Sequence, residues 1–149
     1  MNRFRFRLES VLRFRRAKED EKKREFGITL GELKREEKRY NEIVSSSENH
    51  DRLIEKTGKG RMSIRSLINN FYYARHLDNT KTTQEKVVDA AKEVTNKKHT
   101  ELVEATKKKK VLDRLKERKL EDYNKKLLKE EQDFIDDISS QHFNPENLE

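Results

Sequence analysis

The stretch that decides the fold is Thr57-Gly58-Lys59-Gly60-Arg61-Met62-Ser63-Ile64-Arg65-Ser66. It holds two of the chain's four glycines, and long charged segments of helical character flank it. Glycine adopts positive φ without a Cβ clash and so favours a helix end and a sharp reversal. Ser63 can cap the next helix by accepting a hydrogen bond from a backbone N–H one turn on. We therefore predict one long helix, a turn at about residues 57–63 and a longer returning helix. The alternative is a flexible joint between helices that never pack together.

The composition excludes an ordinary globular domain. Of 149 residues, 31% are apolar and 44% are charged, against roughly 45–50% and about 25% in typical soluble domains. So little apolar surface leaves two classes, a disordered chain or long helices that share a narrow apolar seam. The 36 basic and 29 acidic residues are interspersed, which favours helices because opposite charges pair at i,i+4.

An apolar stripe with heptad spacing runs along the first arm. Its residues are Leu12, Phe26, Leu30, Leu33, Tyr40, Val44 and Ile54. This spacing is typical of a coiled-coil seam, and the polar seam residues Glu19, Glu37 and Ser47 are of the kind that restricts register. Gly27 and Gly31 fall outside the seam.

The returning arm is predicted to run from near Ser63 to about Ser139. Its stripe comprises Ile64, Leu67, Phe71, Ala74, Leu77, Val88, Ala91, Leu102, Ala105, Leu112, Leu115, Leu120, Tyr123, Leu127, Phe134 and Ile138. We therefore predict an all-α protein in which residues 1–139 form one antiparallel coiled-coil hairpin and residues 140–149 a disordered tail. In such a hairpin the numbers of facing residues sum to about 120, which sets Leu12 near Lys108, and the second helix overhangs the first by about five turns. Ser45–Ser47 and Asn79–Thr83 are expected weak points.

The open end of this hairpin is strongly basic. Residues 1–16 carry six arginines against the single acid Glu9, and the run Lys107–Lys110 is expected nearby. Phe4 and Phe6 alternate with arginines, which fits an end that docks in a pocket or on a membrane surface, or phenylalanines that cover the seam of the other helix. The cations predict an acidic partner; the alternative is that they only solvate a coiled coil. The last twenty residues are acidic and could fold back or meet a basic partner.

No catalytic or cofactor-binding constellation is found. The four histidines (His50, His76, His99 and His142) lack metal-ligand spacing, cysteine is absent, and Gly58-Lys59-Gly60 is far short of a phosphate-binding loop. We expect no enzyme activity, cofactor or metal. No signal peptide or membrane-length apolar run is present, so a cytoplasmic protein is expected. The net charge of +7 keeps a basic RNA-binding hairpin or scaffold open as an alternative, although stacking aromatics and a recognised module are missing.

Three sets of residues resemble the FliJ family, a small component of the bacterial flagellar type III export apparatus. The first is Phe4-x-Phe6-x-Leu8-x-x-Val11-Leu12-x-x-Arg15. The second comprises the glycines at 58 and 60, Ile68-Asn69, Tyr73, Leu77 and Asp78-Asn79. The third is Leu115-x-Glu117-Arg118-Lys119-x-x-x-Tyr123 followed by Asp136-Asp137-Ile138. The resemblance covers nearly the whole chain.

The resemblance implies a non-enzymatic stalk, similar to the central stalk of rotary ATPases. Such a stalk sits in the hexameric export ATPase ring, contacts the cytoplasmic domain of the export gate and assists export chaperones, peripherally at the inner face of the cell membrane and without specific nucleic acid. The family's gate-contacting pair corresponds to Tyr73 and Leu77, which could instead be seam residues; Lys81 departs from the usual aliphatic residue. The residues expected to meet the ring are Phe4, Phe6, Arg13, Arg15, Arg16, Lys107, Lys108, Lys109 and Lys110.

Overall fold

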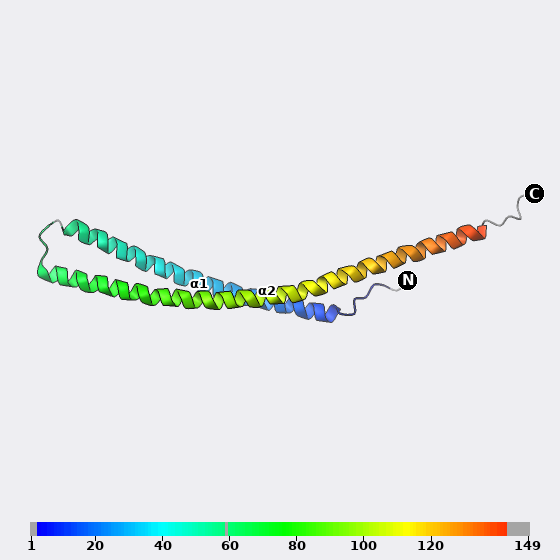
Figure 1. The fold of residues 1–149 in the computed structure, drawn as a ribbon, viewed down its shortest axis with the longest axis horizontal. Helices are drawn as coiled ribbons and strands as arrows, with labels where there is room; N and C mark the ends of the chain where they lie inside the picture. The colour runs from blue at the N-terminus through cyan, green and yellow to red at the C-terminus, as the bar shows by residue number, and fades with distance from the viewer. Residues whose placement is uncertain (1–2, 59, 143–149) are drawn as a thin grey trace, which may run out of the picture. The chain divides into compact units, whose positions relative to one another are not determined.

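The protein is all-helical, as the sequence predicts. A computed structural model describes residues 3–58 and 60–142 and contains two helices, α1 (Glu9–Thr57) and the longer α2 (Ile64–His142) (Figure 1). Helix α2 begins one residue after the predicted start and continues three residues beyond Ser139. The part of the expected tail from residue 143 onward lies outside the described residues.

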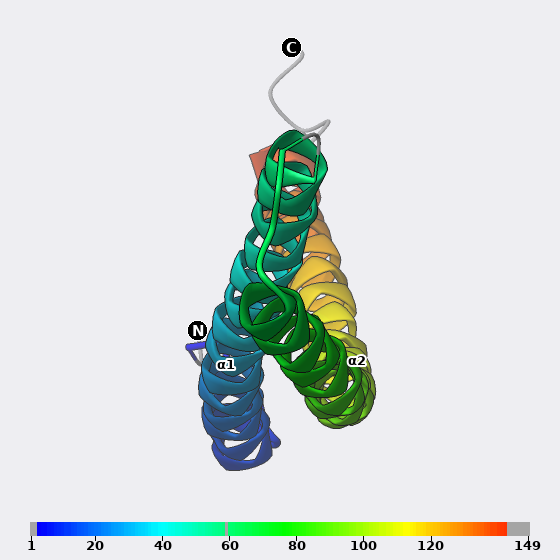
Figure 2. The same cartoon turned by 90° about the vertical axis from the view of Figure 1, so that its left-hand side faces the viewer.

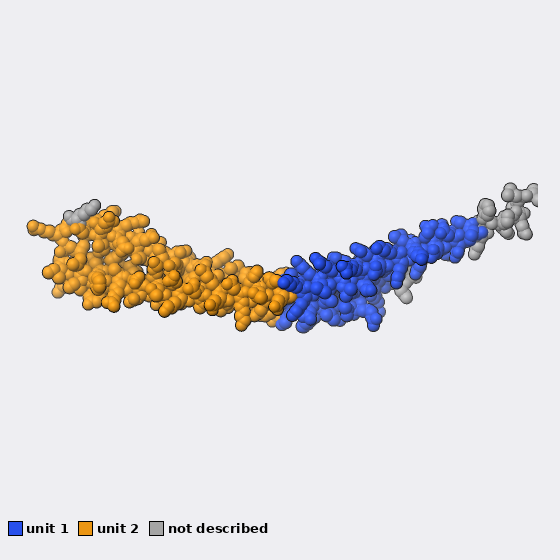
Figure 3. Space-filling model, in the orientation of Figure 1, with its two compact units in different colours: residues 1–19, 105–149 blue, residues 20–104 orange. Residues whose placement is uncertain are grey.

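The chain divides into two compact units, each built from a piece of both helices (Figure 3). Unit 1 comprises residues 1–19 and 105–149, and unit 2 comprises residues 20–104. In each unit the helices run antiparallel, because contacts join low-numbered residues of α1 to high-numbered residues of α2. Examples are Glu9 with Lys116 in unit 1 and Glu36 with Gln84 in unit 2.

The predicted pairing register in unit 1 is wrong by roughly one to two helical turns. Glu9 pairs with Lys116 and Arg16 pairs with Asp113, so the segment that faces Leu12 lies beyond Lys108. The deviation is confined to unit 1, because in unit 2 Glu36 pairs with Gln84 and their numbers sum to 120, as the rule predicts. The turn is therefore not the source of the error.

The turn follows the predicted capping chemistry but not the predicted glycine conformation. The Ser66 amide donates a hydrogen bond of 3.2 Å to the Ser63 hydroxyl, which is the expected N-cap. At the end of α1, the Gly58 amide still bonds Ile54 O at 2.7 Å, and the Gly60 amide bonds Thr57 O at 3.0 Å. Among the described residues no glycine has positive φ, so Gly58 and Gly60 do not use the left-handed conformation that glycine allows.

The core is a narrow seam with few fully buried residues. Leu12 is wholly buried, and Leu77 and Val88 are 7% exposed. The predicted first-arm stripe is confirmed: its other members are half-buried, and Glu19 is buried at a seam position. Both expected weak points are continuous helix, with hydroxyls such as Thr83 Oγ1 bonded to the carbonyl one turn back.

Three residues predicted for the seam near the turn are instead exposed: Ile64, Leu67 and Phe71. Figures 1 and 2 show the reason, since α1 and α2 diverge toward the turn within unit 2. Periodicity predicts which face of a helix is apolar, but not whether the partner helix stays close enough to cover it.

Candidate functional site

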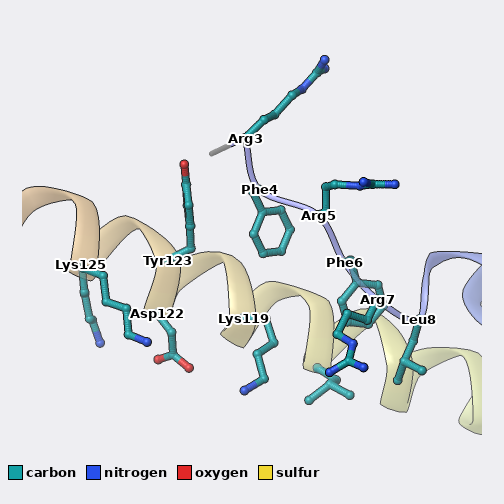
Figure 4. A pocket seen from close by; sticks show the side chains of 12 residues that line it. Arg3, Phe4, Arg5, Phe6, Arg7, Leu8, Lys119, Asp122, Tyr123 and Lys125 are labelled. Carbon is teal, nitrogen blue, oxygen red and sulfur yellow. The ribbon is translucent and has the colours of Figure 1, made fainter. Parts of the chain in front are cut away.

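The N-terminal segment lies in extended form beside α2 in unit 1. Phe4 and Phe6 are half-buried and point toward α2, whereas Arg3 and Arg5 are exposed and point away (Figure 4). The ring centroids of Phe4 and Tyr123 are 5.6 Å apart with the planes tilted by 52°, within the range of favourable aromatic pairs. Of the two interpretations of this end, the geometry matches phenylalanines that cover the seam of the other helix.

This arrangement forms an open groove of about 1430 Å³. Cationic side chains dominate its lining, and Asp122 is the one acid there. The basic lining residues are Arg3, Arg5, Arg7, Lys119, Lys125 and Lys126. Arginine and lysine around an aromatic floor suit an anionic partner that also presents an apolar group.

The start of α1 is tied to α2 by an ion pair. Glu9 stands in the first turn of α1, where a carboxylate also interacts favourably with the helix dipole. Its carboxylate lies 2.7 Å from Lys116 Nζ. The hydrogen bond from Lys116 lowers the pKa of Glu9 below its usual value. This pair fixes the point at which the extended segment gives way to helix.

Two of the predicted ring-contacting cations form ion pairs between the two helices. Lys109 Nζ lies 2.8 Å from the carboxylate of Glu19, which is only 5% exposed and also accepts a 3.0 Å hydrogen bond from Thr106. The bond to Glu19 raises the pKa of Lys109. Arg16 lies 3.0 Å from Asp113. These contacts relieve part of the charge repulsion that the sequence suggests at this end.

The other predicted cations remain on the surface of unit 1. Arg13, Lys107, Lys108 and Lys110 are exposed, and within the part of the chain that the structure describes they form no ion pair. Arg15 is half-buried, and its guanidinium lies 5.8 Å from the ring centre of Phe14. The run Lys107–Lys110 therefore contains one seam residue and three surface residues.

The predicted gate-contacting pair lies near the turn in unit 2 and is split between surface and seam. Tyr73 is 48% exposed and packs edge-on against His50, with ring centres 4.9 Å apart. Leu77 is buried in the seam. Phe71 and Tyr72, which contact each other edge-on, are more exposed than Tyr73. Sequence reasoning missed Tyr72 because it lies off the apolar period.

An interhelical ion network in unit 2 was not predicted. Lys22 lies 2.8 Å from Glu101, and Lys98 lies 2.9 Å from Glu25. A 3.0 Å contact between Lys22 and Glu25 closes the network. The bond from Lys98 lowers the pKa of Glu25, the bond from Lys22 lowers that of Glu101, and the carboxylates raise the pKa of both lysines. Its residues flank the seam on both arms, but pairing them needs the register that the sequence left uncertain.

Within residues 3–58 and 60–142, no group of three or more histidine, aspartate or glutamate side chains could hold a metal ion. No helix in this part of the chain is long and apolar enough to cross a bilayer. Two surfaces stand out in the described chain. One is the basic groove, and the other is the group of exposed aromatic residues Phe71, Tyr72 and Tyr73 on α2 near the turn. Both are suited to macromolecular partners.

Comparison with known proteins gives the family. No curated protein and no solved structure matches the chain. A sequence model of the family described as "Flagellar FliJ protein" matches residues 4–148, which is nearly the full length. The match, together with two long helices of unequal length packed against each other, shows that this chain belongs to the FliJ family and is a component of the flagellar export apparatus.

Proposed function

We propose that this chain is a non-enzymatic stalk that couples the hexameric flagellar export ATPase to the membrane export gate. The observation that carries the proposal is the surplus of unpaired cations on unit 1. Arg13, Lys107, Lys108 and Lys110 are exposed and form no ion pair in the part of the chain that the structure describes, and further arginines and lysines line the groove of the same unit. Clustered like charges at one end of a protein do not help it fold and suit an acidic partner.

Contact with the ring would use two kinds of group. The exposed cations meet acidic side chains around the opening of the ring, and Phe4 and Phe6 hold the N-terminal segment against α2 so that its arginines are presented outward. Lys109 and Arg16 have a different role, because each forms an ion pair that joins α1 to α2. The proposal thus divides eight of the nine predicted ring residues into contacting and positioning groups; Arg15, which lies against Phe14, belongs to neither.

Contact with the gate would use the aromatic surface near the turn. Tyr73 presents about half of its side chain to solvent, and Phe71 and Tyr72 extend the apolar surface beside it. Exposed aromatic clusters of this kind mark protein-binding surfaces. Leu77 lies one helical turn after Tyr73 and is buried in the seam, so it anchors this part of α2. In this account the protein lies in the cytoplasm, reaches the membrane through its partners and assists export chaperones, as the family resemblance implies.

The test is charge reversal in the full chain, assayed with the purified export ATPase. Arg13→Glu, Lys107→Glu and Lys108→Glu are combined, and the same change in charge is made in unit 2 with Lys34→Glu, Arg35→Glu and Arg52→Glu, all exposed residues. We expect the unit 1 triple to abolish stimulation of the ATPase and the unit 2 triple to leave most of it, with helicity unchanged in both.

Equal loss in both triples would mean that only net charge matters, and full stimulation by the unit 1 triple would reject the ring contact.

The gate contact is tested separately with Tyr73→Ala. We expect weaker binding to the cytoplasmic domain of the gate protein at unchanged helicity. Loss of helicity together with binding would show that Tyr73 is only a packing residue.

A further inference from the structure

The run of residues 56–77 contains no aspartate or glutamate, although the chain has 29 acids. It spans the turn and the start of α2, and no other stretch of the sequence is free of acids over half that length. The run carries five basic residues: Lys56, Lys59, Arg61, Arg65 and Arg75. The three arginines are exposed and form no ion pair in the part of the chain that the structure describes. This end of unit 2 therefore carries a positive charge that the run itself does not balance.

An exposed apolar stripe lies in the same run, on the first turns of α2. We call it the turn stripe; its members are Ile64, Leu67, Ile68, Phe71 and Tyr72. Their positions have the spacing of one helix face. Their exposed fractions lie between 48% for Ile68 and 79% for Ile64. Single exposed apolar residues are ordinary on a protein surface, but five on one helix face form a patch that marks an interaction site.

The turn stripe lies beside the face of α2 that is turned to α1, not on it. Half-buried residues at spacings of four mark the face toward α1 and lead to the buried Leu77; they are Met62, Ser66, Asn70 and Ala74. Tyr73 lies on that side too, because its ring packs on His50 of α1. In the described chain α1 is the one helix beside this part of α2, so the turn stripe faces solvent (Figure 1).

We infer that the turn stripe binds the surface of an anionic bilayer, with its apolar side chains in the lipid interface and the nearby arginines on the lipid phosphates. The inference rests on the proposed function, which brings the turn end of the protein to the membrane gate, and it adds lipid as a second partner there. Phe71 and Tyr72 also belong to the proposed gate surface. Tyr73 lies on the other side of the helix, against His50, and is left to the gate protein.

The arrangement of charge around the stripe matches a bilayer surface. Arg65 lies three residues before Ile68, and Arg75 lies four residues after Phe71, so both arginines border the stripe. Their aliphatic stems can cover apolar surface while the guanidinium groups reach phosphates at the headgroup level. A helix with phenylalanine, leucine and isoleucine on one face and arginine beside it is typical of helices that lie in the plane of an anionic membrane. The stripe ends before Asp78, the first acid after the run.

A protein helix is a poorer match for the turn stripe. The covered seam contains a buried acid, Glu19, bonded by Lys109 and Thr106, and polar seam residues of this kind set the register of two helices. The turn stripe contains no charged residue and so specifies no register, which a bilayer does not need. A second copy of the chain would bring another acid-free run of the same sign, and like charges oppose association.

The first experiment uses the full chain and protein-free vesicles of phosphatidylcholine, with or without phosphatidylglycerol. The chain has no tryptophan, so Phe71→Trp places a single reporter in the turn stripe. Phe14→Trp, at a residue of unit 1 with similar exposure, is the matched control. We expect the emission of the first variant to shift to shorter wavelength with the anionic vesicles alone, and that of the second to stay unchanged. No shift in either variant, or equal shifts in both, would overturn the inference.

Paired substitutions measure the apolar contribution. Leu67→Ala with Phe71→Ala should weaken sedimentation with the anionic vesicles by at least about tenfold, because two exposed apolar side chains no longer enter the interface. Helicity should not change. Val111→Ala with Phe14→Ala removes similar exposed side chains from unit 1 and should leave vesicle binding unaltered. Equal loss in the two pairs would contradict the assignment to the turn stripe.

A second pair of variants measures the electrostatic contribution. Arg65→Glu with Arg75→Glu should abolish the preference for phosphatidylglycerol, whereas Lys34→Glu with Arg35→Glu, an equal change of charge at exposed residues of unit 2, should keep most of it. An equal loss of preference in both pairs would show that only net charge attracts the chain to the vesicles, and would overturn the inference.

The outcome for lipid is separable from the outcome for the gate, because the vesicles contain no gate protein and Tyr73→Ala is assayed without lipid. A chain that binds the gate domain but no vesicle would overturn the lipid inference and leave the gate contact standing. A chain that binds vesicles but not the gate domain would do the reverse. A dimer of the chain in the absence of lipid that Leu67→Ala with Phe71→Ala abolishes would assign the turn stripe to self-association and overturn the inference.

Discussion

Two glutamates in unit 1 occupy the same kind of position in very different surroundings. Glu19 lies in the seam between α1 and α2, is 5% exposed and is bound by Lys109 and Thr106. Glu131 lies in the prolongation of that seam, where α2 has no helix beside it, and remains exposed. The comparison shows that one sequence pattern, an apolar stripe with an acid in it, serves as core in one place and as surface in another.

The physical difference is the presence of the second arm. A carboxylate that loses water needs hydrogen bonds and a countercharge, and α2 supplies both to Glu19. From residue 124 to His142, a segment that we call the overhang, no second helix displaces water from α2, so its exposed apolar residues and Glu131 contribute little to stability. The covered seam therefore holds the fold together.

The largest expected effect comes from truncating apolar side chains in the two regions. Leu12→Ala removes a side chain that is wholly buried, and we expect it to lower the free energy of unfolding by about 2–4 kcal/mol. Leu128→Ala removes the same atoms from an exposed position and should change it by less than about 0.5 kcal/mol. Urea denaturation followed by circular dichroism measures both.

If Leu128→Ala were as destabilising as Leu12→Ala, the overhang would be covered in the isolated protein. If neither variant had an effect, the seam around Leu12 would contribute little to stability.

A smaller effect is expected from pH, because the paired carboxylates titrate differently from exposed ones. Glu25 and Glu101 have pKa values lowered from 4.5 by lysine bonds. Their stabilisation is therefore present above pH 4.5 and is lost as the pH falls through their folded-state pKa values. The pKa of Lys98 is raised from 10.5, so its contribution holds below pH 10.5 and is lost as the pH rises through the folded-state value.

The free energy of unfolding should then be nearly constant between about pH 5 and 10 and fall on either side. Glu25→Gln with Glu101→Gln should make the acid slope shallower. Denaturation at a series of pH values gives the slopes. An unaltered slope in the first variant would show that the network makes no net contribution.

The sequence predicted the parts of this structure that depend on local pattern. Heptad spacing placed Leu12 and the other first-arm seam residues correctly, and Ser63 was correctly identified as a cap. The pairing register was correct for Glu36 with Gln84 in unit 2 and wrong in unit 1, because heptad spacing does not determine how far two long stripes are offset from each other.

The candidate site was predictable in composition and only partly in detail. Arg3, Arg5, Arg7 and Arg13 lie at the surface, whereas Arg15 is half-buried. Lys109 is bonded to the buried Glu19. Four consecutive lysines look alike in a sequence; the helix period and the facing arm decide which one is inside. The exposure of Phe71 was missed for a related reason, since periodicity does not report where two helices diverge.

Amide hydrogen exchange on the isolated full chain tests the central claim, that α1 and the N-terminal segment cover the seam of α2 as far as Tyr123 and that no helix lies beside α2 further on. The account predicts slow exchange over Leu102–Leu115 and exchange on the order of tenfold or more faster over Leu127–Ile138. Equal protection of the two segments in the monomer would contradict it, because the overhang would then already be covered.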